Sequence, residues 1–338
     1  SNFKFFIDLL NYKKRNQNLK FLNSKFFYLD QTDEVVFLNN LKELNYEYQE
    51  NFLKKLTSKF EIFNVPINLV AEHNVPEKKF FTEIRSHPLR LKIKNNSNYE
   101  DRKVNGELDF NLINNNKKIN YILKDNYLSF QTNDNKFSGG INIKPFFISS
   151  NLNFYQIDLK KIFQDNSILT NLLKSEVLNN ENLNGVIRVN TKNIKGLNFL
   201  GDTESKIILE EGTIYLQNLR TTFKNAVTVD LKDTQLILDE NRIKFAGFVT
   251  LDFINIKKFF EHYQINIKDR KYISKINLGF LFHLDEKFIE IDNLKVDGNS
   301  NENLNQFFDD LNSKRDNIFN KIVLRNSVKD FFRIISMD

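Results

Sequence analysis

The stretch KIILEEGTIYLQNLRTTFKNAVTVDLKDTQLILDENRIKFAGFVTLDFINIKKFFEHYQI, residues 206–265, consists of short apolar/polar alternations separated by turn residues. Side chains alternate sides along a strand, so this pattern predicts sheet with one apolar face and one face in water. A turn is expected at Asp239-Glu240-Asn241. The residues that we expect to share the apolar face, with Gly247 in line, are Val227, Val229, Leu231, Ile243, Phe245, Val249 and Leu251.

The same alternation runs through most of the chain. Turn-forming groups at residues 114–116, 124–126 and 133–135 follow one another about 9–10 residues apart, a rhythm typical of an antiparallel meander. We therefore predict a mainly β fold: an elongated, curved, groove-like antiparallel sheet of repeated strand modules, punctuated by short amphipathic helices. The expected parts are a β-rich segment 1–100 with a short helix near 1–15, antiparallel modules over 101–300, and a helical tail over 301–338.

Two short helices interrupt the predicted sheet, and their starts resemble each other. IDLKKIF begins at Ile157 and INIKKFF begins at Ile254. In each, Asp158 or Asn255 is placed to cap the helix, two lysines face water, and an apolar pair faces inward. The sequence therefore predicts helices near 158–175 and 255–264, in a sheet built from related modules.

Composition limits the possible partners. The 338 residues include 34 Phe but no Cys, which removes disulfides and thiolate metal sites. The net charge of +6 arises from 49 basic and 43 acidic residues that are interspersed, so nucleic acid is not an expected partner. Weak attraction to an anionic membrane surface is the better alternative. No run of about 18 apolar residues is present, and the start at Ser1 leads us to expect a fragment whose membrane anchor or export signal lies upstream.

A search for reactive groups finds no candidate catalytic, cofactor-binding or metal-ligating residues. The histidines at 73, 87, 262 and 283 share no metal-ligand spacing, and Gly139-Gly140 is better read as a bulge or turn than as a phosphate loop. The abundant Phe has two interpretations. It fills a core, or it lines a sheet face that accepts acyl chains, where burial at about 25 cal/mol per Å² favours lipid without one decisive contact.

Three segments resemble AsmA-like proteins of Gram-negative bacteria. They are LEEGTIYLQNLRTTFKNAVTVDLKDTQLILDENRIKFAGFVTLDFINIKKFFEHYQI, the upstream FSGGINIKPFFISSNLNFYQIDLKKIF, and the final SNENLNQFFDDLNSKRDNIFNKIVLRN. The likeness covers about residues 100–330 and rests on the order and rhythm of strands, turns and short helices. It implies a periplasmic protein, anchored to the inner membrane, with a groove-forming β-structure. It also implies a role in outer-membrane biogenesis and phospholipid transport.

These observations give one leading hypothesis and two alternatives. The leading hypothesis is a non-enzymatic protein whose apolar sheet face, with the row Val227 to Leu251 as its candidate surface, binds phospholipid or another acyl lipid. The first alternative is a structural β-scaffold that docks envelope proteins and carries no lipid. The second is a carbohydrate-active β-solenoid, which would need a cluster of carboxylates and aromatic residues on one exposed face.

Overall fold

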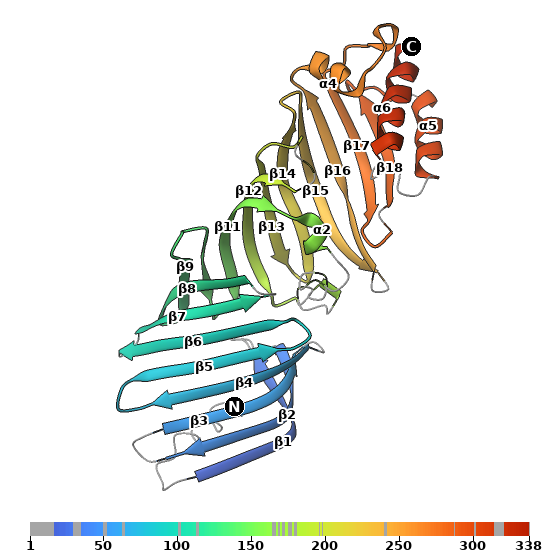
Figure 1. The fold of residues 1–338 in the computed structure, drawn as a ribbon. Coiled ribbons are helices and arrows are strands. Elements are labelled where there is room, and N and C mark those ends of the chain that lie inside the picture. Colours follow the sequence, from blue (N-terminus) through green and yellow to red (C-terminus); the bar gives the residue numbers. More distant parts are fainter. Residues whose placement is uncertain are drawn as a thin grey trace. The chain divides into compact units, whose positions relative to one another are not determined.

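The protein is mainly β. The computed structural model describes residues 17–29, 35–49, 53–62, 65–100, 103–112, 115–163, 181–195, 199–239, 242–286, 288–300, 302–313 and 321–337, with positions 167, 170, 173, 174, 178 and 197. It is 65% strand, and its curved, open antiparallel sheet with short helices and a helical C-terminal segment confirms the predicted fold class. The chain divides into two compact units, Ser1–Phe147 and Ile148–Asp338 (Figure 1). The module limits predicted at residues 100 and 300 stay predictions.

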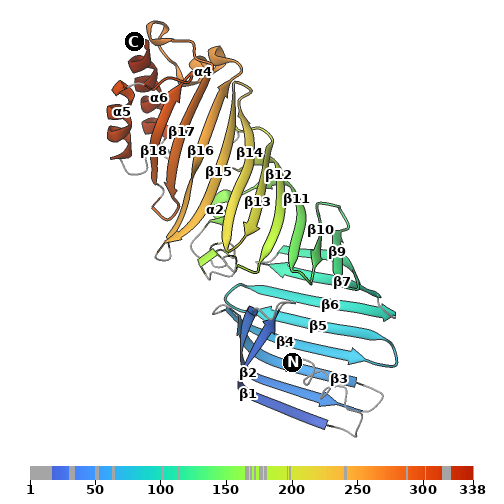
Figure 2. The ribbon, with the colours of Figure 1, turned by 180° about the vertical axis from the view of Figure 1, so that it is seen from behind.

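The first unit is an antiparallel meander in which each strand pairs with the next. Asp125 and Asn135 take positive φ values of 52° and 53° in its turns, a conformation that Asp and Asn adopt more readily than most residues. The short helix predicted near residues 1–15 lies outside the described residues. Figure 2 shows this unit from behind. Its strands are β1 Gln17–Leu29, β2 Val35–Tyr48, β3 Leu53–Ile62, β4 Val65–Asn74, β5 Lys79–Ser86, β6 Leu91–Glu100, β7 Lys103–Leu112, β8 Asn115–Lys124, β9 Tyr127–Thr132 and β10 Phe137–Asn142.

The second unit combines strands with short helices. From β12 to β18, each strand pairs antiparallel with the next. The strands are β11 Phe147–Ile157, β12 Asn184–Ile194, β13 Thr203–Glu210, β14 Thr213–Phe223, β15 Val227–Asp239, β16 Arg242–Phe253, β17 Lys275–His283 and β18 Phe288–Val296. The helices are α2 Leu159–Ile162, α4 Ile256–Tyr263, the 3₁₀ helix η2 Ile267–Asp269, α5 Glu302–Asn312 and α6 Lys321–Ser336.

The neighbouring strands β11 and β12 depart from the meander. The backbone N–H of Lys195 donates to Ile157 O at 2.8 Å, and the amide of Asn190 donates to Asn153 Oδ1 at 2.9 Å. Gly185 approaches the backbone of Ile148. In all three contacts the later residue follows its β11 partner by nearly the same number of residues. Residue numbers therefore rise together along the two strands, as they do in a parallel pair. Parallel neighbours need a long crossover connection, and residues 158–183 supply it.

The two predicted helix caps are present. Asp158 and Asn255 each accept a hydrogen bond from the backbone N–H three residues later, at 3.3 Å and 3.2 Å. The helix after Asp158 ends at Ile162, although helical backbone recurs at Thr170 and Leu173. The helix after Asn255 runs to Tyr263, one residue short of its predicted end. The two related segments therefore differ in setting, since α2 begins a parallel crossover and α4 joins antiparallel strands.

Replacing Asn255 by alanine is expected to destabilise the second unit by about 1 kcal/mol, because the N–H of Lys258 then loses its acceptor. Urea unfolding measures the change, and Asn255→Asp is the matched control that keeps an acceptor oxygen. An alanine variant as stable as the aspartate variant would contradict this role for the cap.

In the second unit, a helical layer covers one end of the sheet. Phe260 of α4 and Phe332 of α6 are each 1% exposed and meet edge to face, with ring centroids 5.1 Å apart. Leu304 of α5, also 1% exposed, joins the same cluster, which rests on Ile276 and Leu294 of the sheet. Figure 1 shows α5 and α6 beside β17 and β18. Within the predicted helical tail, α5 and α6 thus contribute to the core of this unit.

Candidate functional site

The first unit carries an apolar face that its strand register assembles. Leu69 of β4 pairs with Ile84, which pairs with Ile93, which pairs with Phe110. Directly paired residues point to the same side of a sheet, so these four form an unbroken apolar row across β4–β7. We call the whole set the N-terminal apolar face: Leu56, Phe60, Ile67, Leu69, Ile84, Ile93, Leu108, Phe110, Ile119, Leu123, Leu128 and Phe130.

The N-terminal apolar face is only half-buried. Every member keeps part of its surface exposed, whereas core residues such as Phe332 are 1% exposed. None of the described residues from 17 to 147 is helical, so no helical layer from this range covers the face. A short buried cluster, Leu41, Leu44 and Tyr46, fills it near β2. The remainder can still bury area against a partner.

The opposite face of the first unit carries the ion pairs that join its strands. The carboxylate of Glu43 lies 3.2 Å from Lys20 Nζ and 3.5 Å from Lys59 Nζ, and Lys118 Nζ lies 2.9 Å from Glu107. A hydrogen bond from Asn45, followed by the contact with Lys20, lowers the pKa of Glu43. Exposed ion pairs contribute little stability. What matters here is the face on which these ion pairs lie. Because they lie on the opposite face, the N-terminal apolar face is largely free of charge.

A small polar group lies at one edge of this apolar face. His73 Nε2 lies 2.8 Å from the Tyr99 hydroxyl, and the His73 ring stacks on Phe80 with centroids 4.2 Å apart. Burial, and then the nearby Lys54, lowers the pKa of His73, so the imidazole is neutral at pH 7. Lys54 pairs with His73 in register and lies 5.7 Å from the Tyr48 ring centroid. Among the described residues, no carboxylate forms an ion pair with Lys54.

The second unit holds the row predicted from sequence, and the register brings its residues to one face. Val229 pairs with Leu251, and Leu231 pairs with Val249. The row extends onto the neighbouring strands. Leu231 also pairs with Leu219 of β14, and Val249 pairs with Leu278 of β17. Ile243 and Phe245 share the face by alternation along β16. We call the predicted row, together with Leu219 and Leu278, the C-terminal apolar face.

Burial divides the predicted row into ends and a middle. Val227 is 2% exposed and packs with Phe223 and Ala226, while Ile243 is 0% exposed and packs with Leu173. Both are core residues. Leu251 and Phe245 are half-buried and contact the clusters at the two ends. The half-buried Val229, Leu231 and Val249 belong to none of the buried clusters of described residues, so this middle part is the open surface of the row.

Gly247 lies in the same row because no larger residue fits there. A Cβ at this position would lie 2.8 Å from Thr234 Cα. Thr234 is 0% exposed and lies in the bulge where the β15–β16 register shifts, between Lys232 and Gln235. The bulge therefore presses the β15 backbone against β16 at this point.

Gly247→Val is expected to destabilise the second unit by about 1–3 kcal/mol, since the added side chain must displace the buried Thr234 backbone. Urea unfolding gives the difference. The control is Ala246→Val, one residue earlier and on the other face, which should change stability by less than about 1 kcal/mol. Equal effects at the two positions would contradict the close approach.

The described residues hold no group of three or more His, Asp or Glu side chains arranged to bind a metal ion. His283 Nε2 lies 3.1 Å from Glu290, and His262 packs edge-on against Phe223.

Sequence reasoning missed the N-terminal apolar face as a site. Its signal, the alternation of Leu108 and Phe110, was visible, but the extent of the face depends on a register spanning many strands.

Comparisons of this chain with protein-family models, with curated proteins and with solved structures found no match. The resemblance to AsmA-like proteins therefore stays a prediction. Of the helices in the described part of the chain, none has the length and apolar character required to cross a membrane.

Proposed function

We propose that this chain is a non-enzymatic lipid-binding protein that holds or conducts phospholipid acyl chains along its apolar sheet faces. The observation that carries the proposal is the N-terminal apolar face: half-buried aliphatic and aromatic residues continue across strands β3–β9, and the ion pairs between strands lie on the other side. An acyl chain buries area on such a surface at about 25 cal/mol per Å². Affinity then comes from many small contacts, so no point site is needed.

Lys54 and His73 suit the polar end of such a ligand. A lysine ammonium without an acidic partner among the described residues attracts an anionic headgroup, and the stacked His73 and Phe80 rings offer a flat surface beside it. A phospholipid with its tails on the N-terminal apolar face could place its phosphate at this edge. The proposal therefore favours an anionic lipid over a neutral one.

A β-scaffold for envelope assembly is the second candidate, and the buried ends of the predicted row favour it. Val227 and Ile243 are covered by the protein's own side chains, as expected of a filled sheet. On the resemblance alone, either function belongs in the periplasm of a Gram-negative bacterium, with the protein anchored to the inner membrane and active in outer-membrane biogenesis. Envelope proteins would then be its partners.

Lipid analysis of the purified chain distinguishes the two candidates. Organic extraction followed by mass spectrometry is expected to recover phospholipid in stoichiometric amounts, and the delipidated protein should take up a fluorescent fatty acid. A protein that carries no lipid and accepts no fatty acid would support the scaffold and reject lipid binding.

A further inference from the structure

A second surface, distinct from the apolar faces, lies at one edge of the second unit. The connections after β14 and β16 meet at this edge, since Ile254 donates its backbone N–H to Ala226 O at 2.9 Å. Three large apolar side chains here point into water: Ile254 is 67% exposed, Ile267 82% and Tyr272 63%. We call the segment from Ile254 to Tyr272 the loop edge.

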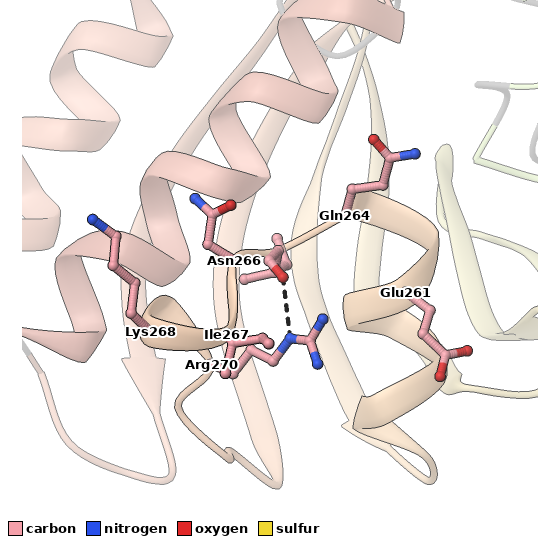
Figure 3. Close-up of a pocket in the computed structure, with 7 residues that line it drawn as sticks. Glu261, Gln264, Asn266, Ile267, Lys268 and Arg270 are labelled. Atoms are coloured by element: carbon pink, nitrogen blue, oxygen red, sulfur yellow. Dashed lines mark hydrogen bonds between the residues drawn. The ribbon is translucent and has the colours of Figure 1, made fainter.

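The loop edge is held rigidly. Ile265 and Ile273, on either side of η2, are 2% and 6% exposed and insert into the helical core. Arg270 Nε donates to Ile265 O at 3.1 Å, the dashed bond in Figure 3, and Asn266 donates to Asp269 at 3.1 Å. The Tyr272 ring meets Phe260 edge to face. Ile267 is therefore presented outward by an ordered loop whose neighbouring isoleucines are buried.

Basic residues are close in sequence to these exposed apolar side chains. Lys257, Lys258, Lys268, Arg270 and Lys271 all lie within the loop edge and are exposed. In the described part of the chain none of these five forms an ion pair, unlike Lys275, whose Nζ lies 3.2 Å from Asp252. Of the two acidic residues in the segment, Asp269 is 8% exposed and bonded to Asn266, whereas Glu261 is exposed, so basic residues still outnumber acidic ones. Ile267, Lys268 and Arg270 line a shallow depression after α4, together with Glu261 and Gln264 (Figure 3).

We propose that the loop edge docks the protein onto an anionic lipid bilayer. Cations near a membrane surface are attracted to anionic headgroups, and exposed Ile and Tyr side chains gain free energy by entering the interface. Nucleic acid would use the same cations but would leave Ile254 and Ile267 in water. The combination of an excess of positive charge with protruding apolar side chains thus favours a membrane. This inference stands apart from acyl-chain binding, since it concerns the outside of the protein and an intact bilayer.

The test is co-sedimentation of the full chain with phosphatidylcholine vesicles, with and without phosphatidylglycerol. The wild-type protein is expected to bind the anionic vesicles at least about tenfold more tightly than the neutral ones, and added salt should weaken that binding. Ile267→Asp with Tyr272→Asp, and separately Lys268→Glu with Lys271→Glu, should each weaken binding about tenfold or more. Circular dichroism verifies that these exposed substitutions leave the fold intact.

The matched controls make the same kinds of substitution at exposed residues outside the loop edge. Tyr155 and Phe248 are 74% and 54% exposed but lie on strands, so Tyr155→Asp with Phe248→Asp should bind vesicles like the wild type. Lys192→Glu with Lys295→Glu controls for charge. Leu69→Asp with Ile93→Asp, which alters the N-terminal apolar face, should also leave vesicle binding unchanged. Docking is refuted if the wild type binds neither vesicle, or if the loop-edge and control variants bind equally.

Discussion

Leu69→Asp with Ile93→Asp is expected to raise the dissociation constant for a fluorescent fatty acid by at least about tenfold. Both residues are half-buried members of one apolar row, linked through Ile84. An acyl chain laid over them would bury a carboxylate without a partner, and burying an unpaired charge is strongly unfavourable. Fluorescence titration of the delipidated protein measures the effect.

The control places the same charges on the other side of the same strands. Asn68→Asp with Asn98→Asp adds the same two negative charges at exposed positions of β4 and β6, and these carboxylates face the ion-paired side. Fatty-acid affinity should then change by less than about twofold, since no acyl chain is displaced. If both pairs weaken binding equally, or neither does, acyl chains do not lie on the N-terminal apolar face.

Phe332→Ala is expected to destabilise the second unit by about 3–5 kcal/mol, the range for removing a fully buried phenyl ring. Phe332 is 1% exposed and contacts the rings of Phe259, Phe260 and Phe331. Its loss would leave a cavity where α6 meets α4. Urea unfolding followed by circular dichroism gives the free energy of unfolding.

Phe248→Ala is the matched control, because Phe248 is 54% exposed. The same deletion there should change stability by about 0.5 kcal/mol or less. A Phe332→Ala variant less than about 1 kcal/mol below the wild type would show that the helical tail contributes little to the core.

Strand positions followed from the sequence, but burial did not. Val227 and Val229 both alternate onto the same face, yet Val227 is 2% exposed and Val229 is half-buried. The difference arises from residues distant in sequence, because Phe199 and Phe259 pack against the buried cluster that contains Val227. Ile243 is likewise covered by Leu173. Local periodicity indicates which way a side chain points, whereas a covering residue is set by tertiary packing.

The register, that is, which residues of neighbouring strands pair with each other, could not be predicted from the sequence pattern either. The group formed by Lys54, His73, Phe80 and Tyr99 comes from four successive strands, and a shift of one residue in any pairing would separate it. The parallel pairing of β11 with β12 had no local signal either, because a helix cap at Asp158 precedes parallel and antiparallel connections alike. By contrast, the caps at Asp158 and Asn255 depend on adjacent residues only, and both were predicted.

Site-specific photocrosslinking in cells tests most directly whether lipid lies on the N-terminal apolar face. A photoreactive amino acid is placed at Ile84 or Leu123, on the apolar face, and at the adjacent Arg85 or Lys124, on the other side. We predict phospholipid adducts at Ile84 and Leu123 and none at Arg85 and Lys124. Adducts at none of the four positions, or at equal levels on both faces, would contradict lipid binding by this sheet.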